Sequence, residues 1–202
     1  AAKSVVDQDP QTQYAGPLVV LVTKYSASAS EILAAAMQDY HRAIIMGGTT
    51  YGKGTVQQVF DLDNAVTPAA NFLKPLGSLK LTIQKFYRVN GGSTQFKGVV
   101  PDIILPDVLT SYAKGEQESE YPLLWDEIAP ATYKPTNSLP SLDKLRAASA
   151  ARVAVSPGFR LISEAAQYST ERRKQTTLSL NLAAYRTTQQ QLRAINKQQT
   201  AA

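Results

Sequence analysis

Residues 17–48 read PLVVLVTKYSASASEILAAAMQDYHRAIIMGG, and this stretch decides the fold of the N-terminal half of the chain. Pro17 to Thr23 is a short apolar run rich in Val and Leu, typical of a strand buried on both faces. Apolar residues then recur at helical spacing from Ile32 to Asp39, and a second apolar run from Ala43 to Met46 ends at two glycines. The pattern predicts a strand, a helix and a second, parallel strand, which together form one βαβ unit.

A polar motif follows each of the two predicted strands. SASASE (residues 26–31) comes after the first strand, and YGKGTVQ (residues 51–57) comes after the second. Parallel strands joined by a right-handed crossover end at the same edge of a sheet, about 4.8 Å apart, so we expect Ser28 and Lys53 on the same side. Small residues around both positions leave room for a close approach. Serine and lysine placed in this way look like the two halves of a Ser/Lys peptidase site.

The sequence also offers Ser28 a purely structural role. Ser28-x-x-Glu31 matches a capping box, in which the serine hydroxyl and the glutamate side chain satisfy free N–H groups at a helix start. The same position suits catalysis, because those N–H groups and the helix dipole stabilise an oxyanion that forms there. Ser26 and Ser30 are assigned to structure. Both interpretations of Ser28 stay open on spacing alone.

Lys53 has two competing interpretations besides catalysis. A lysine in a glycine turn is ordinarily a solvated surface charge. The spacing Gly47-x-x-x-x-Gly52-Lys53 also supplies most of a Walker A phosphate-binding motif. That motif fails at Gly54, which stands where the Mg²⁺-binding Ser or Thr belongs, and residues 55–62 alternate like a strand instead of opening a helix. The sequence therefore argues against nucleotide binding.

Further strands and helices are predicted beyond this unit. Leu79 to Val89 is typical of a long strand, and the Asn90-Gly91 turn signal predicts that residues 93–96 return as its hairpin partner. A last short strand is expected at Ile103 to Leu105, and residues 63–75 are expected to form a loop near the site. Apolar positions at helical intervals predict three C-terminal helices, over residues 142–153, 157–173 and 183–197.

Composition sets limits on the class of protein. With 202 residues, 44% of them hydrophobic, the chain can bury a real core, and with no cysteine it has neither disulfides nor thiolate metal sites. Residues 141–202 hold ten Lys or Arg and three acidic residues, a net charge of +7, whereas residues 1–140 carry −2. No aromatic-interleaved basic motif or zinc pattern accompanies the positive helices, so we expect a solvated or domain-facing surface and no nucleic acid.

Several segments closely resemble the tail-specific, or C-terminal processing, proteases, and in particular their bacterial periplasmic branch, the Prc/Tsp type. The resemblance is specific over residues 14–107. It is carried by the following segments: residues 16–22 (GPLVVLV), Ser28, Glu31, residues 35–40 (AAMQDY), 51–58 (YGKGTVQQ), 81–94 (LTIQKFYRVNGGST) and 98–103 (GVVPDI). Looser similarity continues at residues 124–126, 129–133 and 179–181.

The resemblance implies a set of site residues. By this similarity the nucleophile falls on Ser28, the lysine base on Lys53, a supporting glutamine on Gln57 and a backbone oxyanion donor on Ala29. The family's PDZ-like domain and the glycine-rich segment with the second oxyanion donor would precede residue 1, so the chain is expected to be a C-terminal fragment. No cofactor or metal is implied.

The resemblance also implies partners and a compartment. We expect protein substrates with unstructured, apolar C-termini, a lipoprotein adaptor, and a periplasmic location, peripheral to the inner membrane.

The fold implied is an α/β core of the ClpP/crotonase type, with a parallel βαβ unit and a β-hairpin, followed by a helical C-terminal extension. We expect residues 1–107 to be part of the peptidase core, 108–140 a linker or irregular segment, and 141–202 a helical region. The alternative to a peptidase is a noncatalytic scaffold or partner-binding module with the same fold.

Residue types fix the chemistry that such a site would use. The only histidine, His41, follows the predicted helix and is far from the strand end, so a Ser-His-Asp site is not expected. A free lysine amine titrates near 10.4, so a lysine base at neutral pH needs surroundings that disfavour its charge. We expect Val56, Val59 and Phe60 to form an apolar wall, and the Gln57 amide to bind the amine without adding negative charge.

Overall fold

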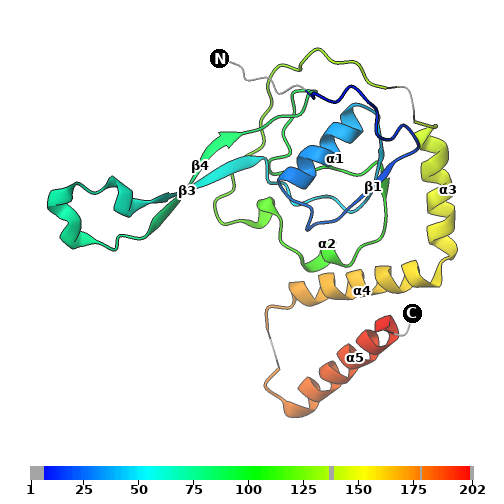
Figure 1. Ribbon diagram of the computed structural model, residues 1–202. Helices are drawn as coiled ribbons and strands as arrows, with labels where there is room; N and C mark the ends of the chain where they lie inside the picture. The colour runs from blue at the N-terminus through cyan, green and yellow to red at the C-terminus, as the bar shows by residue number, and fades with distance from the viewer. Residues whose placement is uncertain (1–6, 137–138, 178, 201–202) are drawn as a thin grey trace.

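The computed structural model describes residues 7–136, 139–177 and 179–200, and Figure 1 shows how their elements are arranged. The predicted βαβ unit is present: β1 (Val19–Val22) leads into α1 (Ala29–Asp39), and β2 (Ile44–Gly47) follows. The two strands are parallel neighbours, with Val20 opposite Ile45. The predicted order of strand, helix and parallel strand is therefore confirmed. The expected burial of the first strand on both faces is wrong, because Val19 and Leu21 are 50 and 71% exposed.

A third parallel strand completes the small sheet. β5 (Ile103–Ile104) pairs with β2, which gives the strand order β1-β2-β5. The buried core lies between this sheet and α1, and its members are Val22, Ala34, Ala35, Ala43, Ile45 and Val99. Alanines on the inner face of α1 let the helix approach the sheet closely. The carboxyl ends of β1 and β2 thus hold the two polar motifs at one edge.

The hairpin differs from the one that the sequence predicted. β3 (Thr55–Asp61) pairs antiparallel with β4 (Ser78–Lys85), and two short 3₁₀ helices, η1 (Leu62–Ala65) and η2 (Pro68–Leu73), connect them. In Figure 1 this arm projects away from the sheet, so the segment predicted as a loop near the site lies at the far tip of the hairpin.

The predicted pairing of residues 79–89 with residues 93–96 is wrong. β4 ends at Lys85, and Gly92 forms only an isolated bridge, to Glu127. Residues 93–95 are buried and turn inward instead of forming a strand. The strong Asn-Gly turn signal is real, but tertiary contacts of the residues after it override hairpin formation.

Helices make up the C-terminal part, as the sequence predicted. A short α2 (Leu109–Tyr112) and η3 (Glu116–Glu118) precede α3 (Leu142–Val155), α4 (Pro157–Lys174) and α5 (Leu182–Thr200). α3 packs beside β5, α4 beside α2, and α5 beside α4 (Figure 1). No helix in the described ranges is long and apolar enough to cross a membrane. The division of the chain at residues 107 and 140 stays a prediction.

An ion pair fixes the C-terminal end of α1 to the segment after β4. Arg88 donates to both carboxylate oxygens of Asp39, at 2.6 and 2.9 Å, and to the Gln38 side chain at 2.9 Å. The side chains of Arg88 and Asp39 are only 17% and 6% exposed. Asn90 donates to the same carboxylate at 3.1 Å. Two-point guanidinium binding of this kind sets orientation as well as distance.

Candidate active site

Ser28 is the residue that joins the loop after β1 to α1. Its φ is +57° and its ψ is −114°, and positive φ is uncommon for a residue with a Cβ atom. The Ser28 carbonyl accepts from the N–H groups of Glu31 and Ile32, at 2.9 and 3.0 Å, and so starts the helix. The side chains of Ser28 and Glu31 keep the reciprocal arrangement of a capping box, but the Ser28 hydroxyl makes no capping hydrogen bond. The helix cap therefore does not use the hydroxyl that a nucleophile needs.

The neighbouring serines have the structural roles predicted for them. Ser26 Oγ accepts from the Thr23 N–H at 3.1 Å, and Ser30 Oγ donates to the Ala27 carbonyl at 2.8 Å. Both bonds are local, because each joins residues three positions apart in the chain around Ser28.

The Glu31 carboxylate lies completely buried between the two polar motifs, with 0% exposure. One of its oxygens, Oε1, accepts from the Thr50 hydroxyl at 2.5 Å and from the Gly52 N–H at 2.7 Å. The other, Oε2, accepts from the Ser28 N–H at 2.8 Å and from the Lys53 N–H at 2.9 Å. Four donors at the positive end of a helix stabilise a buried carboxylate.

This carboxylate brings the backbones of Ser28 and Lys53 together. Both N–H groups bind the same oxygen atom, so the two residues lie next to each other at the carboxyl edge of the sheet. A backbone hydrogen bond from the Tyr51 N–H to the Ser26 carbonyl, 2.9 Å long, joins the same two loops. From the sequence, Glu31 was predicted only as half of a capping box, which accounts for one of its four hydrogen bonds, the one from the Ser28 N–H. The other three join residues that only the fold brings together, so no sequence spacing predicts them.

The turn around Lys53 is tightly held, whereas its side chain is half-buried. Gly52 has φ +98°, and a Cβ atom there would lie 3.0 Å from the Phe96 carbonyl oxygen, so glycine is required at this position. The residues predicted to form an apolar wall around Lys53 do not enclose its side chain in the described structure. Val56, Val59 and Phe60 are themselves 40, 61 and 39% exposed.

The remaining predicted site residues fall around this centre. Gln57 is exposed on β3, just after a register shift in the pairing with β4. Ala29 is the first residue of α1, and its N–H donates to no acceptor in the described part of the chain. His41 is exposed and follows the opposite end of the eleven-residue α1, which separates it from Ser28. No group of His, Asp or Glu side chains in the described ranges is arranged to hold a metal ion.

Two known families match this chain, one after the other. Residues 2–105 match peptidase family S41, and residues 110–202 match the C-terminal domain of tail specific protease. The first match covers the βαβ unit, both polar motifs and the hairpin. The second covers all of α2 except its first residue, and all the helices that follow it.

Individual relatives agree with the family matches. The chain is 45% identical to the tail-specific protease of Haemophilus influenzae over 185 residues, which are 87% of this chain and 25% of that protein. It is 39% identical to the carboxy-terminal-processing protease of Bartonella bacilliformis over 49% of this chain and 20% of that protein. The chain thus spans about a quarter or less of the length of these two relatives.

A solved structure is also similar. The photosystem II D1 C-terminal processing protease is 37% identical, over 45% of this chain and 21% of that one, with a TM-score of 0.37. The family matches, which together run along nearly the whole chain, carry the assignment. This chain belongs to peptidase family S41, and its C-terminal part matches the C-terminal domain of tail specific protease.

Proposed function

We propose that this chain carries the catalytic dyad of a serine endopeptidase, with Ser28 as nucleophile and Lys53 as general base. The observation that supports the proposal most is the buried Glu31 carboxylate, whose one oxygen binds the N–H groups of both residues. The Ser28 hydroxyl makes no hydrogen bond that caps the helix. Helix capping therefore does not explain why a hydroxyl stands at this position.

The reaction follows from the residue types. Lys53, in its uncharged form, takes the proton of the Ser28 hydroxyl as the oxygen attacks a substrate peptide carbonyl. The amine then gives this proton to the leaving nitrogen, and the peptide bond breaks to leave an acyl-serine. A water molecule, deprotonated by the same amine, hydrolyses the ester. Gln57, four residues after the lysine, is proposed to hydrogen-bond the amine without adding negative charge.

The start of α1 supplies the proposed oxyanion site. The Ala29 N–H is adjacent to the nucleophile, lies at the positive end of the helix and has no acceptor in the described structure. A donor aimed at the developing oxyanion contributes substantially to acyl transfer, and losing one typically slows it by about 10²–10³-fold. We propose that a segment preceding this chain in a longer protein supplies the second donor.

Substrate class and compartment are part of the same proposal. Membership of this peptidase family implies protein substrates. We propose that the longer protein processes or degrades proteins from unstructured, apolar C-terminal regions, with a lipoprotein adaptor, in the bacterial periplasm at the inner membrane. Cell fractionation tests the location, and cleavage of one reporter protein with an apolar or a charged tail tests the preference.

The catalytic assignment is tested in the full-length gene product that carries this chain. A serine-directed fluorophosphonate probe is expected to label the protein at Ser28, with the modified residue found by peptide mass spectrometry. Ser28→Ala is expected to remove the label and all cleavage of an unfolded protein substrate, and Lys53→Ala is expected to reduce both to background.

A matched control is Ser30→Ala, which removes a neighbouring hydroxyl whose bond is local. It is expected to keep both labelling and cleavage. Near-normal cleavage by Ser28→Ala would overturn the assignment, and a folded, unaltered protein that neither cleaves nor takes the label would favour the noncatalytic scaffold.

A further inference from the structure

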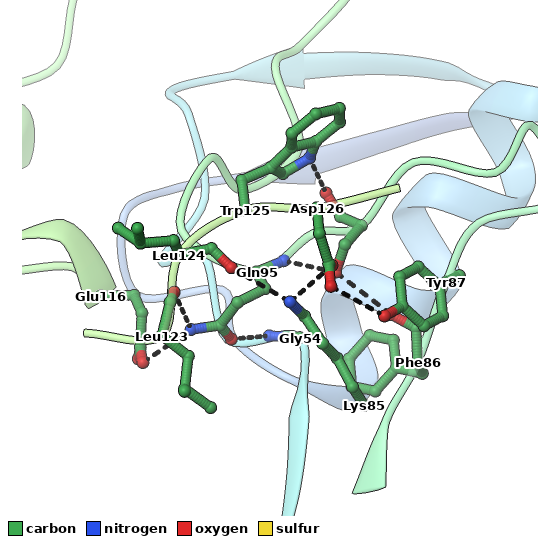
Figure 2. Close-up of polar contacts among 11 residues, drawn as sticks. Gly54, Lys85, Phe86, Tyr87, Gln95, Glu116, Leu123, Leu124, Trp125 and Asp126 are labelled. Atoms are coloured by element: carbon green, nitrogen blue, oxygen red, sulfur yellow. Dashed lines mark hydrogen bonds and ion pairs between the residues drawn. The ribbon is translucent and has the colours of Figure 1, made fainter. Parts of the chain in front are cut away.

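Gln95 is a fully buried polar side chain directly behind the Lys53 turn. Its exposure is 0%, and it lies ten residues after β4 in a segment without strand or helix. Its amide oxygen accepts from the Gly54 N–H at 2.8 Å. Its amide nitrogen donates to the Glu116 carboxylate at 2.9 Å and to the Leu123 carbonyl at 3.0 Å. Figure 2 shows the amide between these three partners. Both of its donor hydrogens are therefore in use.

The bond to Gly54 acts on the residue next to the proposed base. The Lys53 N–H is held by Glu31, and the following N–H, that of Gly54, is held by Gln95. The two side chains thus fix the peptide groups on both sides of the Lys53 Cα atom. The two segments also approach each other closely here, because a Cβ atom on Gly54 would lie 2.5 Å from the Gln95 backbone nitrogen.

The other two partners of Gln95 belong to a different part of the chain. Glu116 and Leu123 lie within the C-terminal domain match, whereas Lys53 lies within the peptidase match. The Glu116 N–H also donates to the Tyr51 carbonyl, at 2.9 Å, so the segment touches the lysine turn directly as well. The first residues of the C-terminal domain are therefore part of the support of the lysine turn.

The same segment has a second attachment that does not involve the turn. Asp126 pairs with Lys85 of β4 at 2.5 Å and accepts from the Tyr87 hydroxyl at 3.2 Å (Figure 2). Trp125 donates to the Ser93 carbonyl at 3.0 Å. The chain thus offers a matched comparison: one set of contacts that reaches the lysine turn and another that only holds the segment in place.

We propose that Gln95 is a positioning residue for Lys53, and that it transmits the docking of residues 116–123 to the proposed catalytic lysine. The inference rests on the proposed Ser28/Lys53 chemistry. Glu116 and Leu123 orient the Gln95 amide so that its oxygen faces the Gly54 N–H. When these partners are removed, the amide loses its orientation and the peptide after Lys53 is released.

The test measures the rate of fluorophosphonate labelling of Ser28 against pH in the full-length gene product. Gln95→Ala is expected to slow labelling by about 100-fold, the size of effect that a displacement of about 1 Å produces. The pH of half-maximal labelling is expected to change as well, because the amine that takes the Ser28 proton is no longer held in place. A merely less stable protein would lose labelled fraction without a change in that pH.

Double substitutions separate transmission from general loosening. Glu116→Ala is expected to slow labelling by a smaller factor, and its effect is expected to disappear when Gln95→Ala is already present. Asp126→Asn, the matched control on the second attachment, is expected to leave labelling within twofold and to combine independently with Gln95→Ala. If Gln95→Ala fails to fold, the exchanged pair Gln95→Glu with Glu116→Gln is compared with Gln95→Glu alone. The exchange restores a donor opposite an acceptor at the contact between positions 95 and 116, whereas both variants leave an oxygen facing the Leu123 carbonyl. The exchanged pair is therefore expected to label faster than Gln95→Glu alone.

The outcomes distinguish the inference from the function on which it rests. No labelling of the unaltered, folded protein at Ser28 overturns both. Labelling at Ser28 with an unmoved pH profile in Gln95→Ala, or with independent effects of Gln95→Ala and Glu116→Ala, overturns the role of Gln95 and leaves the dyad in place. Failure of the exchanged pair to exceed Gln95→Glu alone overturns the role of Gln95 as well.

Discussion

Replacing the buried Glu31 carboxylate by its amide, Glu31→Gln, is expected to destabilise the protein and to separate Ser28 from Lys53. The carboxylate accepts four hydrogen bonds, two at each oxygen. An amide of the same shape has one oxygen, and its NH₂ group faces two donors in either orientation. Two buried donors therefore lose their acceptor.

The size of the effect follows from these two donors. A buried donor without a partner costs about 1–3 kcal/mol, so Glu31→Gln is expected to lower the free energy of unfolding by about 2–6 kcal/mol. That is a large part of the roughly 5–15 kcal/mol that stabilises a typical domain. With the amide oxygen facing Thr50 and Gly52, the N–H groups of Ser28 and Lys53 both face the NH₂ group, and the link between the two loops is broken.

Urea unfolding followed by circular dichroism measures the loss, and fluorophosphonate labelling of the folded fraction measures the site. Asp102→Asn is a suitable control. Asp102 accepts one bond at each oxygen, from the Ile45 N–H at 2.9 Å and from Gln38 at 3.0 Å, away from the lysine turn. It is expected to cost about 1–3 kcal/mol, for one lost acceptor, and to leave labelling of the folded fraction unchanged. If the free energy of unfolding of Glu31→Gln is lower than that of the unaltered protein by less than about 1 kcal/mol, the reasoning is refuted.

Three further outcomes are expected. Arg88→Ala leaves the buried Asp39 carboxylate on α1 without its cation, so the free energy of unfolding measured in urea should fall by about 3–5 kcal/mol. An unchanged unfolding midpoint would contradict this role of the ion pair. Gly54→Ala forces a Cβ atom against the Gln95 backbone and should cost about 1–3 kcal/mol, measured in the same way, with neutrality counting against the close approach. The Lys85 ammonium, through its hydrogen bond, lowers the pKa of the Asp126 carboxyl, so this contact stabilises the fold above about pH 4 and is lost as pH falls through the lowered value. Unfolding midpoints of Asp126→Asn should therefore depend less on pH below 4, and parallel pH curves for the two proteins would rule this out.

Local pattern was enough to predict the elements that carry the proposed dyad. The apolar runs on either side of α1 are short and continuous, and they end at polar or small residues, as strands do. Between them the apolar residues recur at helical spacing, so strand, helix and strand follow from the sequence. The placement of Ser28 and Lys53 at one sheet edge follows from parallel topology alone. The C-terminal helices were equally predictable, because their apolar positions recur at 3.6-residue intervals.

The contacts between elements could not be predicted in this way. Asn90-Gly91 is a strong hairpin signal, yet the strand that precedes it pairs with β3, because partner choice depends on residues far away in the sequence. Gln95 has no motif, and its burial follows from three partners that lie 21, 28 and 41 residues away. For the same reason, the sequence predicted the local capping bond of Glu31 but not its bonds to Thr50, Gly52 and Lys53.

The separation in sequence of the partners around the lysine turn implies an order of assembly. Glu31 reaches its partners on the second loop over 19 to 22 residues, so that closure needs only the βαβ unit. The hydrogen bonds of the Gln95 amide need residue 123 as well, and this residue leaves the ribosome later. Contacts that close longer loops also form later during folding. A nascent chain thus has its serine and lysine loops joined before the peptide after the lysine is secured. The proposed hydrolytic centre then reaches its final form only after residues 116–123 have been made.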